Sequence, residues 1–267
     1  MSSKASARIR SRTVRSVGEF VQAVVEIADI LNAPYGGIWY RGVGDRRLSL
    51  APGIVWRKVD DEDSLIEDFL VGVPALTAQE ISEPWHLYSL MQHHGLPTRL
   101  LDWSKSPLVA LFFALAHGVD HDERSVSCVW VMNPYRLNFL ALEIEEVFAA
   151  RSNYGIDEHN SFKVNYLPRP LRPLHRTDKV PAPPMAIEPA FTNRRLVSQQ
   201  GCFTVHGTDP SGLERLPGMS ESLFRLEVPS RHCKRVREEL EQLGFRADWI
   251  YQDLDRLSLR ILKERCP

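Results

Sequence analysis

Side chains that can carry chemistry are concentrated between Met91 and Trp103, where the chain reads MQHHGLPTRLLDW. They provide an amide, two imidazoles, a hydroxyl, a guanidinium and a carboxylate, which are groups that bind anions or transfer protons. Arg99 and Asp102 are flanked by apolar residues, and a buried charge needs a partner because burial of a lone charge costs several kcal/mol. Two interpretations stay open: an internal Arg99–Asp102 pair that pins a loop, or direct contact of both residues with a ligand.

A second unusual charge, Arg41, lies in the apolar stretch IWYRGV, which spans Ile38–Val43. This stretch is expected to be a strand, on which alternate side chains point to opposite faces. Trp39 and Val43 would then share a face with Arg41. Gly42 would permit close approach of backbone or ligand, because it has no Cβ.

The element that must position these groups is a central helix that begins at Pro107. Ser106 is a suitable N-cap, Pro107 suits the first helical position, and Gly118 can end the helix in the left-handed conformation. The residues between them leave almost no polar face, so the helix is expected to be buried. It is too short to cross a bilayer, which takes roughly 20 residues. We therefore expect a polar loop held by a buried helix.

The rest of the pattern predicts an α+β fold: a helical N-terminal half around the buried central helix, with a mixed or antiparallel sheet. Capping residues and apolar periodicity predict the helices, and alternation or continuous apolar runs predict the strands. Further helices are expected over 17–31, 63–70, 76–94 (broken or kinked at Pro84), 134–150, 194–200, 230–243 and 247–264, and further strands over 126–132, 185–188, 202–206 and 222–228.

Residues 1–15 carry five basic side chains and no acid, and are expected to be a disordered basic N-terminus. Residues 16–267 are expected to form one domain with a proline-rich loop at 167–184. The net charge of −1 argues against membrane and nucleic-acid partners, although binding of nucleic acid through the basic proline-rich loop stays an alternative.

Cysteine and histidine placement argues against a structural metal. The four cysteines, Cys128, Cys202, Cys233 and Cys266, are scattered without a CxxC motif, which is typical of a reducing, cytoplasmic compartment. The adjacent histidines at 93 and 94 have no third ligand at zinc spacing, so helix capping is the preferred interpretation.

Three motifs together resemble the FRG domain family. They are Tyr40-Arg41-Gly42, the block from Gln92 to Trp103 that continues into the apolar helix, and an R-x-x-x-Q-x-G-x-F element formed by Arg195, Gln199, Gly201 and Phe203. The resemblance implies a module found in bacterial and phage-associated proteins, with no universally assigned activity.

The aromatic-Arg-Gly strand also resembles the first motif of arginine-type ADP-ribosyltransferases, where the arginine holds the NAD pyrophosphate. That resemblance implies a similar fold and NAD as a substrate, with no metal, although the chain lacks that family's Ser-Thr-Ser and Glu-x-Glu elements. Asp102 is the first candidate for the anion that stabilises the reacting ribose, with Gln200 or Glu188 as substitutes. The expected catalytic residues are thus Arg41, Asp102 and Gln200, and the expected nucleotide-binding residues are Tyr40, Gly42, His93, Thr98, Arg99 and Gln199.

Two main hypotheses follow from these residues. In the first, the chain binds NAD or a related nucleotide and acts on a macromolecular acceptor, or cleaves NAD, as a toxin or phage-defence effector. In the second, it is a non-catalytic sensor or interaction module whose motif residues form a structural network. Trp39, Tyr40 and Trp103 could stack on a base, but core packing is the expected role of at least two of them.

Overall fold

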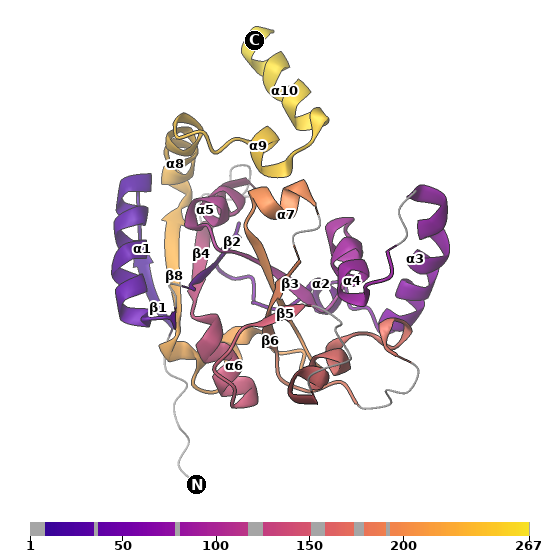
Figure 1. The fold of residues 1–267 in the computed structure, drawn as a ribbon. Helices are drawn as coiled ribbons and strands as arrows, with labels where there is room; N and C mark the ends of the chain where they lie inside the picture. The colour runs from indigo at the N-terminus through magenta and orange to yellow at the C-terminus, as the bar shows by residue number, and fades with distance from the viewer. Residues whose placement is uncertain are drawn as a thin grey trace.

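A mixed eight-stranded sheet lies at the centre of the computed structural model, which describes residues 9–34, 37–77, 81–116, 125–150, 158–173, 179–190 and 193–266. Within these ranges the strand order is β1-β8-β4-β2-β3-β7-β6-β5 (Figure 1). The strands are β1 (Arg10–Thr13), β2 (Trp39–Val43), β3 (Leu100–Ser104), β4 (Val126–Met132), β5 (Phe148–Ala150), β6 (Met185–Pro189), β7 (Gly201–Val205) and β8 (Leu223–Pro229). The edge strands β1 and β5 run parallel to their neighbours, and the pairs between them are antiparallel. The α+β class is confirmed.

Helices connect the strands along the chain and follow the last of them. They are α1 (Val17–Leu31), α2 (Gly53–Trp56), α3 (Glu62–Leu76), α4 (Pro84–His93), α5 (Pro107–Ala116), α6 (Pro134–Leu142), α7 (Arg194–Ser198), α8 (Ser230–Gln242), α9 (Ala247–Tyr251) and α10 (Leu254–Arg265). 3₁₀ segments lie at Glu158–Tyr166, Arg169–Leu171, Leu213–Arg215 and Met219–Glu221. In the part of the chain that the structure describes, no helix combines the length and apolarity needed to span a membrane.

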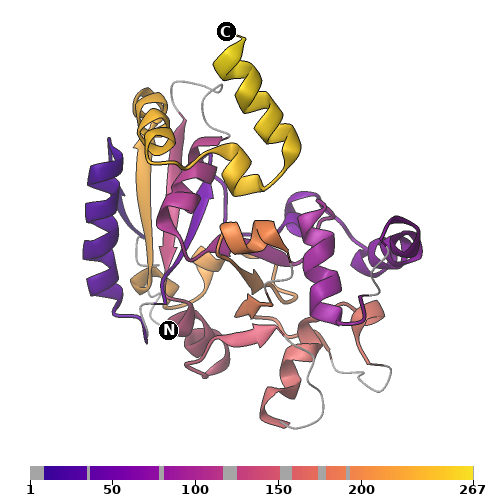
Figure 2. The ribbon, with the colours of Figure 1, turned by 45° about the horizontal axis from the view of Figure 1, so that its top comes forward.

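Two separate groups of helices cover one face of the sheet (Figures 1 and 2). α1, α5 and α8 pack at the β4–β8 end, where Phe20, Leu111 and Leu226 are buried together. α3 and α4 pack at the β6–β7 end, where Ile66 and Val205 are buried in a second cluster. A third cluster fills the opposite face under α6.

Strand register shows that the first two clusters share a face. Tyr40 lies opposite Ser104 in the β2–β3 pair, so their side chains point to the same side. Tyr40 belongs to the first cluster. Leu100 is four residues from Ser104 on β3, so it points to the same face, and it belongs to the second cluster. The boundary between the two helix groups therefore lies over β2 and β3.

α5 confirms the predicted buried helix, and a glycine on β2 allows its close approach. Val109, Ala110, Leu111, Ala114 and Leu115 of α5 are all buried. A Cβ at Gly42 would lie 1.8 Å from the main-chain oxygen of Ala110. Gly42 therefore serves close packing of a helix backbone on the strand.

Several local expectations are wrong. Leu100–Ser104 is not part of a loop but strand β3, because it pairs with β7 on one side and β2 on the other. The helix expected to continue to residue 150 ends at Leu142, since Glu143 adopts a left-handed φ of 61°, and β5 follows. The helix expected over 76–94 begins only at Pro84, whose missing N–H suits a first turn.

The two ends of the chain also differ from expectation. Arg10–Thr13 is not disordered but forms β1, because its main chain pairs with β8, while residues 1–8 lie outside the described residues. The last expected helix is two helices, separated at Gln252, whose φ is 55°. Gly118 and residues 174–178 of the proline-rich loop also lie outside the described residues.

Candidate functional site

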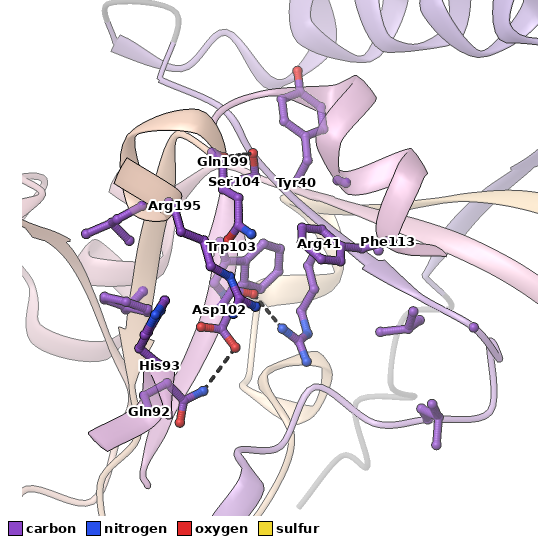
Figure 3. Close-up of a pocket in the computed structure, with 18 of the residues that line it drawn as sticks. Tyr40, Arg41, Gln92, His93, Asp102, Trp103, Ser104, Phe113, Arg195 and Gln199 are labelled. Carbon is purple, nitrogen blue, oxygen red and sulfur yellow. Dashed lines mark hydrogen bonds between the residues drawn. The ribbon is translucent and has the colours of Figure 1, made fainter. Parts of the chain in front are cut away.

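A cleft of about 680 Å³ lies at the boundary between the two helix groups (Figure 3). Strands β2, β3 and β7 line it, as do α4, α5 and α7. Its lining residues include Tyr40, Arg41, Gly42, Asp45, Arg47, Gln92, His93, Asp102, Trp103, Ser104, Phe113, Arg195, Gln199 and Phe203. The volume falls within the range of about 300–1,000 Å³ that is usual for small-molecule sites.

Arg41 reaches from β2 to β3 where the two strands stop pairing. The only register partners of this strand pair are Tyr40 and Ser104. Beyond them, Nη1 of Arg41 donates a hydrogen bond of 2.6 Å to the main-chain oxygen of Asp102. Its Nε is buried and has no hydrogen-bond partner. Burial lowers the pKa of Arg41, and the negative charge of Asp102 partly opposes that effect.

Asp102 points its carboxylate into the cleft and is held from α4 (Figure 3). Nε2 of Gln92 donates a hydrogen bond of 2.9 Å to Oδ2 of Asp102. The amide of Gln92 is itself oriented, because its Oε1 accepts a hydrogen bond of 2.7 Å from Oγ1 of Thr98. The Asp102 residue is exposed. The motif thus supplies a carboxylate held by a relay of side chains.

Aromatic and imidazole groups complete the walls. Burial raises the pKa of Tyr40 to about 12, so its hydroxyl stays protonated at neutral pH. Phe113 of α5 lines the same wall. Burial lowers the pKa of His93, the positive charges of Arg195 and His94 lower it further, and Asp102 opposes them. The imidazole is therefore neutral at pH 7.

The third sequence motif forms the remaining wall. Arg195 lies on α7, and Gln199 is the C-cap of that helix. Oγ of Ser104 donates a hydrogen bond of 2.6 Å to the main-chain oxygen of Gln199, which ties α7 to β3. Three motifs that are far apart in sequence therefore line one cleft.

Arg99 lies outside the cleft lining, and its partner is not Asp102. Its Nε contacts Oε2 of Glu62 at 2.6 Å, and its other nitrogens donate to the main-chain oxygens of Tyr166 and His206. Arg99 is 9% exposed. The expected internal arginine pair therefore exists, but with a glutamate of α3. Burial disfavours the charge of Arg99, yet Tyr88 and Glu62 outweigh burial and raise its pKa.

Other predicted residues also lie outside the cleft lining. Thr98 is fully buried and acts through Gln92. Gln200 adopts a φ of 46° at the end of α7 and lines a separate, open groove beside Trp249. Glu188 forms a salt bridge of 2.7 Å with Lys105. Trp39 is buried in the cluster on the opposite face.

The remaining predicted residues, Tyr40, Arg41, Gly42, His93, Asp102 and Gln199, do line the cleft. Sequence reasoning did not select Gln92, Arg195 or Phe113 as site residues. Gln92 and Arg195 are the first residues of the second and third motifs, so that position was the available signal. Phe113 belongs to the apolar helix into which the second motif continues, but its residue type indicated core packing and not a site.

No group of three or more His, Cys, Asp or Glu side chains suited to a metal ion occurs in the described ranges. The cysteines at 128, 202 and 233 are buried thiols, the one at 266 is exposed, and all four are free.

Together, the fold and the cleft define an α+β protein with a ligand-sized site over the gap between two central strands. The family model of the FRG domain matches residues 36–123, so the chain contains an FRG domain. The matched range runs from β2 to α5 and includes Arg41, Gln92 and Asp102, but not Arg195 or Gln199. Comparison with curated proteins and with solved structures found no match.

Proposed function

We propose that the cleft binds NAD or a closely related nucleotide, and that the chain acts as an ADP-ribosyltransferase or an NAD-cleaving effector. The observation that carries this proposal is the Arg41 guanidinium. It lies in the gap between β2 and β3, with one nitrogen bound to Asp102 and a buried Nε that has no partner. A planar guanidinium with a free donor is suited to oxygen atoms of a phosphate.

The other lining residues fit a dinucleotide in charge and shape. Arg195 adds a second guanidinium on the opposite wall, and Tyr40 and Phe113 add aromatic surface. Ligand sites usually combine apolar walls with a few well-placed polar groups. A pyrophosphate between Arg41 and Arg195 would leave the rings of the ligand for the aromatic surface.

The proposed reaction breaks the bond between the nicotinamide nitrogen and the ribose carbon. The bonding electrons leave with nicotinamide, which becomes neutral, and positive charge develops on the ribose. The carboxylate of Asp102, oriented by Gln92, stabilises that charge. Water or a nucleophilic side chain of an acceptor then forms the new bond to the ribose carbon and loses a proton. Water gives NAD hydrolysis, and a protein acceptor gives ADP-ribosylation.

The test is incubation of the purified chain with NAD, with nicotinamide release as the readout. Arg41→Ala should abolish release, and Asp102→Asn should reduce it strongly. Arg235→Gln removes a charge on α8 without touching the cleft and should leave the rate unchanged. Addition of labelled NAD to a cell extract would then separate acceptor modification from hydrolysis. Absence of nicotinamide release and of NAD binding by the unmodified chain would overturn the proposal.

A toxin or phage-defence role is the biological setting that we propose. It predicts a fall in cellular NAD when the chain is expressed, and no such fall with Arg41→Ala.

A non-catalytic interaction module is the second candidate. The observation that favours it is the network in which Arg99 joins Glu62, Tyr166 and His206. All three nitrogens of the Arg99 guanidinium contact the protein in this network, so it is built for structure and not for a ligand. In that case Arg41 would act in the same way, as a structural tie between β2 and β3. Arg41→Ala would then lower the melting temperature strongly, and NAD would not raise that of the unmodified chain.

A further inference from the structure

The wall of the cleft that carries Arg195 is held in place by the C-terminal part of the chain. Oγ of Ser198 and Nε2 of Gln199 both donate hydrogen bonds to the main-chain oxygen of Ile250, at 3.1 and 3.2 Å. Ile250 is fully buried on α9. These two bonds join the C-terminal end of α7, a helix of five residues, to α9.

The next residue, Tyr251, contacts Arg195 itself. The Cζ atom of Arg195 lies 5.0 Å from the centroid of the Tyr251 ring, within the range of a cation–π interaction. The ring is fixed from α5 by edge-on contacts with Phe112 and Phe113, at centroid distances of 6.1 and 5.8 Å. Phe113 also lines the cleft, so the aromatic cluster and the site share a wall.

The Arg195 guanidinium has no carboxylate partner among the described residues. An ion pair would hold it, but would also neutralise the charge that an anionic ligand needs. An aromatic face restrains an arginine and leaves its charge and its N–H groups available. Contact with a ring therefore suits a side chain that must be ordered and still bind.

We propose that Tyr251 is a positioning residue, which holds the guanidinium of Arg195 over the cleft to receive an anionic group of the ligand. The identity of that ligand rests on the proposed function; the positioning itself does not. Tyr251 lies well beyond the matched range of residues 36–123. The C-terminal segment thus completes a site that the FRG domain begins.

The experiment uses His93 as an internal reporter, because the positive charge of Arg195 lowers the pKa of His93. The other charged groups that act on His93 are His94 and Asp102, and neither is changed. The pKa of His93 is measured by NMR titration of the full chain without ligand. Arg195→Gln should raise it. Tyr251→Leu should raise it in the same direction, whereas Tyr251→Phe, which keeps the ring, should not.

The matched control is Arg256→Gln. Arg256 contacts the same ring, also at 5.0 Å, but it lies on α10 and does not line the cleft. It should leave the pKa of His93 unchanged. A fluorinated phenylalanine at position 251 keeps the ring shape, weakens its negative face and has no hydroxyl to ionise, so it covers the case in which Tyr251→Leu does not fold. The fluorinated ring should raise the pKa of His93, but by less than Arg195→Gln does.

NAD binding is the second readout. Arg195→Gln should weaken binding roughly tenfold. Tyr251→Leu should weaken it about threefold to tenfold, with recovery in Tyr251→Phe. A His93 pKa that responds to Arg195→Gln but not to Tyr251→Leu or the fluorinated ring would overturn the positioning role. If the unmodified chain does not bind NAD, the proposed function fails while the His93 titration still decides the role of Tyr251.

Discussion

Nη1 of Arg41 lies 2.6 Å from the main-chain oxygen of Asp102, across the gap where β2 and β3 cease to pair. Both residues belong to sequence motifs whose side chains can carry chemistry, yet this bond joins a side chain to a backbone atom. It leaves the carboxylate of Asp102 free to accept from Gln92. The guanidinium and the carboxylate are therefore side by side without neutralising each other in a direct ion pair.

The first prediction concerns Arg41→Met, which removes the guanidinium but retains an apolar chain. The free energy of unfolding should change by no more than about 1 kcal/mol, because loss of the bond to Asp102 is offset by relief from burying a charge. NAD binding should be lost. Urea denaturation and calorimetric titration measure the two effects. A large loss of stability together with unchanged nucleotide binding would favour the structural-network hypothesis.

The second prediction concerns the support of Asp102. Gln92→Leu removes the donor to its carboxylate, and the rate of NAD cleavage should fall about tenfold to hundredfold because the charged group is less well oriented. Binding of NAD should change little. Thr98→Val removes the hydroxyl that orients Gln92 and that also accepts from the main-chain N–H of Leu100. The carboxylate of Asp102 keeps its donor in this variant, so the effect on rate should be smaller and in the same direction. If both variants weakened NAD binding equally and left the rate unchanged, the proposal that Thr98 orients Gln92 and Gln92 orients Asp102 would be contradicted.

The third prediction separates the Arg99 network from the site. Glu62→Gln leaves the Arg99 charge buried without its carboxylate and should cost about 3–5 kcal/mol of stability. Arg235→Gln breaks an exposed pair on α8 and should cost at most about 0.5 kcal/mol. Chemical denaturation measures both. The folded fraction of Glu62→Gln should still bind NAD, since Arg99 does not line the cleft.

The fourth prediction compares two glycines. Gly42→Ala places a Cβ 1.8 Å from the Ala110 oxygen and 2.5 Å from the Ala114 nitrogen, so α5 must move and the chain should be destabilised by more than about 4 kcal/mol. Gly72→Ala, on the exposed side of α3, meets nothing within 4 Å and should stabilise by about 0.5–1 kcal/mol. Thermal unfolding should show opposite shifts. A small effect of Gly42→Ala would mean that α5 packs less closely on β2.

The fifth prediction concerns pH and His206. Burial, together with the charges of Arg41 and Arg99, lowers the pKa of His206 from 6.5 to about 3. Between these values the unfolded chain binds a proton that the folded chain does not, so stability rises with pH. The free energy of unfolding should therefore decrease as pH falls from 6.5 toward 3, by up to about 1.4 kcal/mol per pH unit.

Urea denaturation across this interval measures that slope. The interval above about pH 5 is the most informative, because carboxylates contribute mainly below it. His206→Gln should flatten the curve there, while the contribution of His93, which has the same sign, remains. An unchanged slope would show that His206 is protonated in the folded state.

Local signals in the sequence were sufficient for several elements. The N-cap of α1 is Ser16, which accepts from the main-chain N–H of Glu19, and this interaction depends on neighbours three residues apart. The continuous apolar run of α5 required burial whatever packed around it. Three sequence motifs were also expected to converge on one cleft, and residues from all three line it.

What the sequence by itself determined, then, was the class of fold, the buried central helix and most of the residue types at the site. Tertiary structure decided the pairings, because these join residues that are distant in the chain. β3 is a strand because β2 and β7 form hydrogen bonds with it. Arg99 pairs with Glu62, which lies 37 positions earlier in the chain, and Arg195 contacts Tyr251 of another helix. Gln199 and Gln200 are neighbours, yet the left-handed backbone at Gln200 sends only Gln199 to the cleft. Sequence patterns carry periodicity and local preference, whereas the partner of a buried charge depends on which segments the whole sheet brings together.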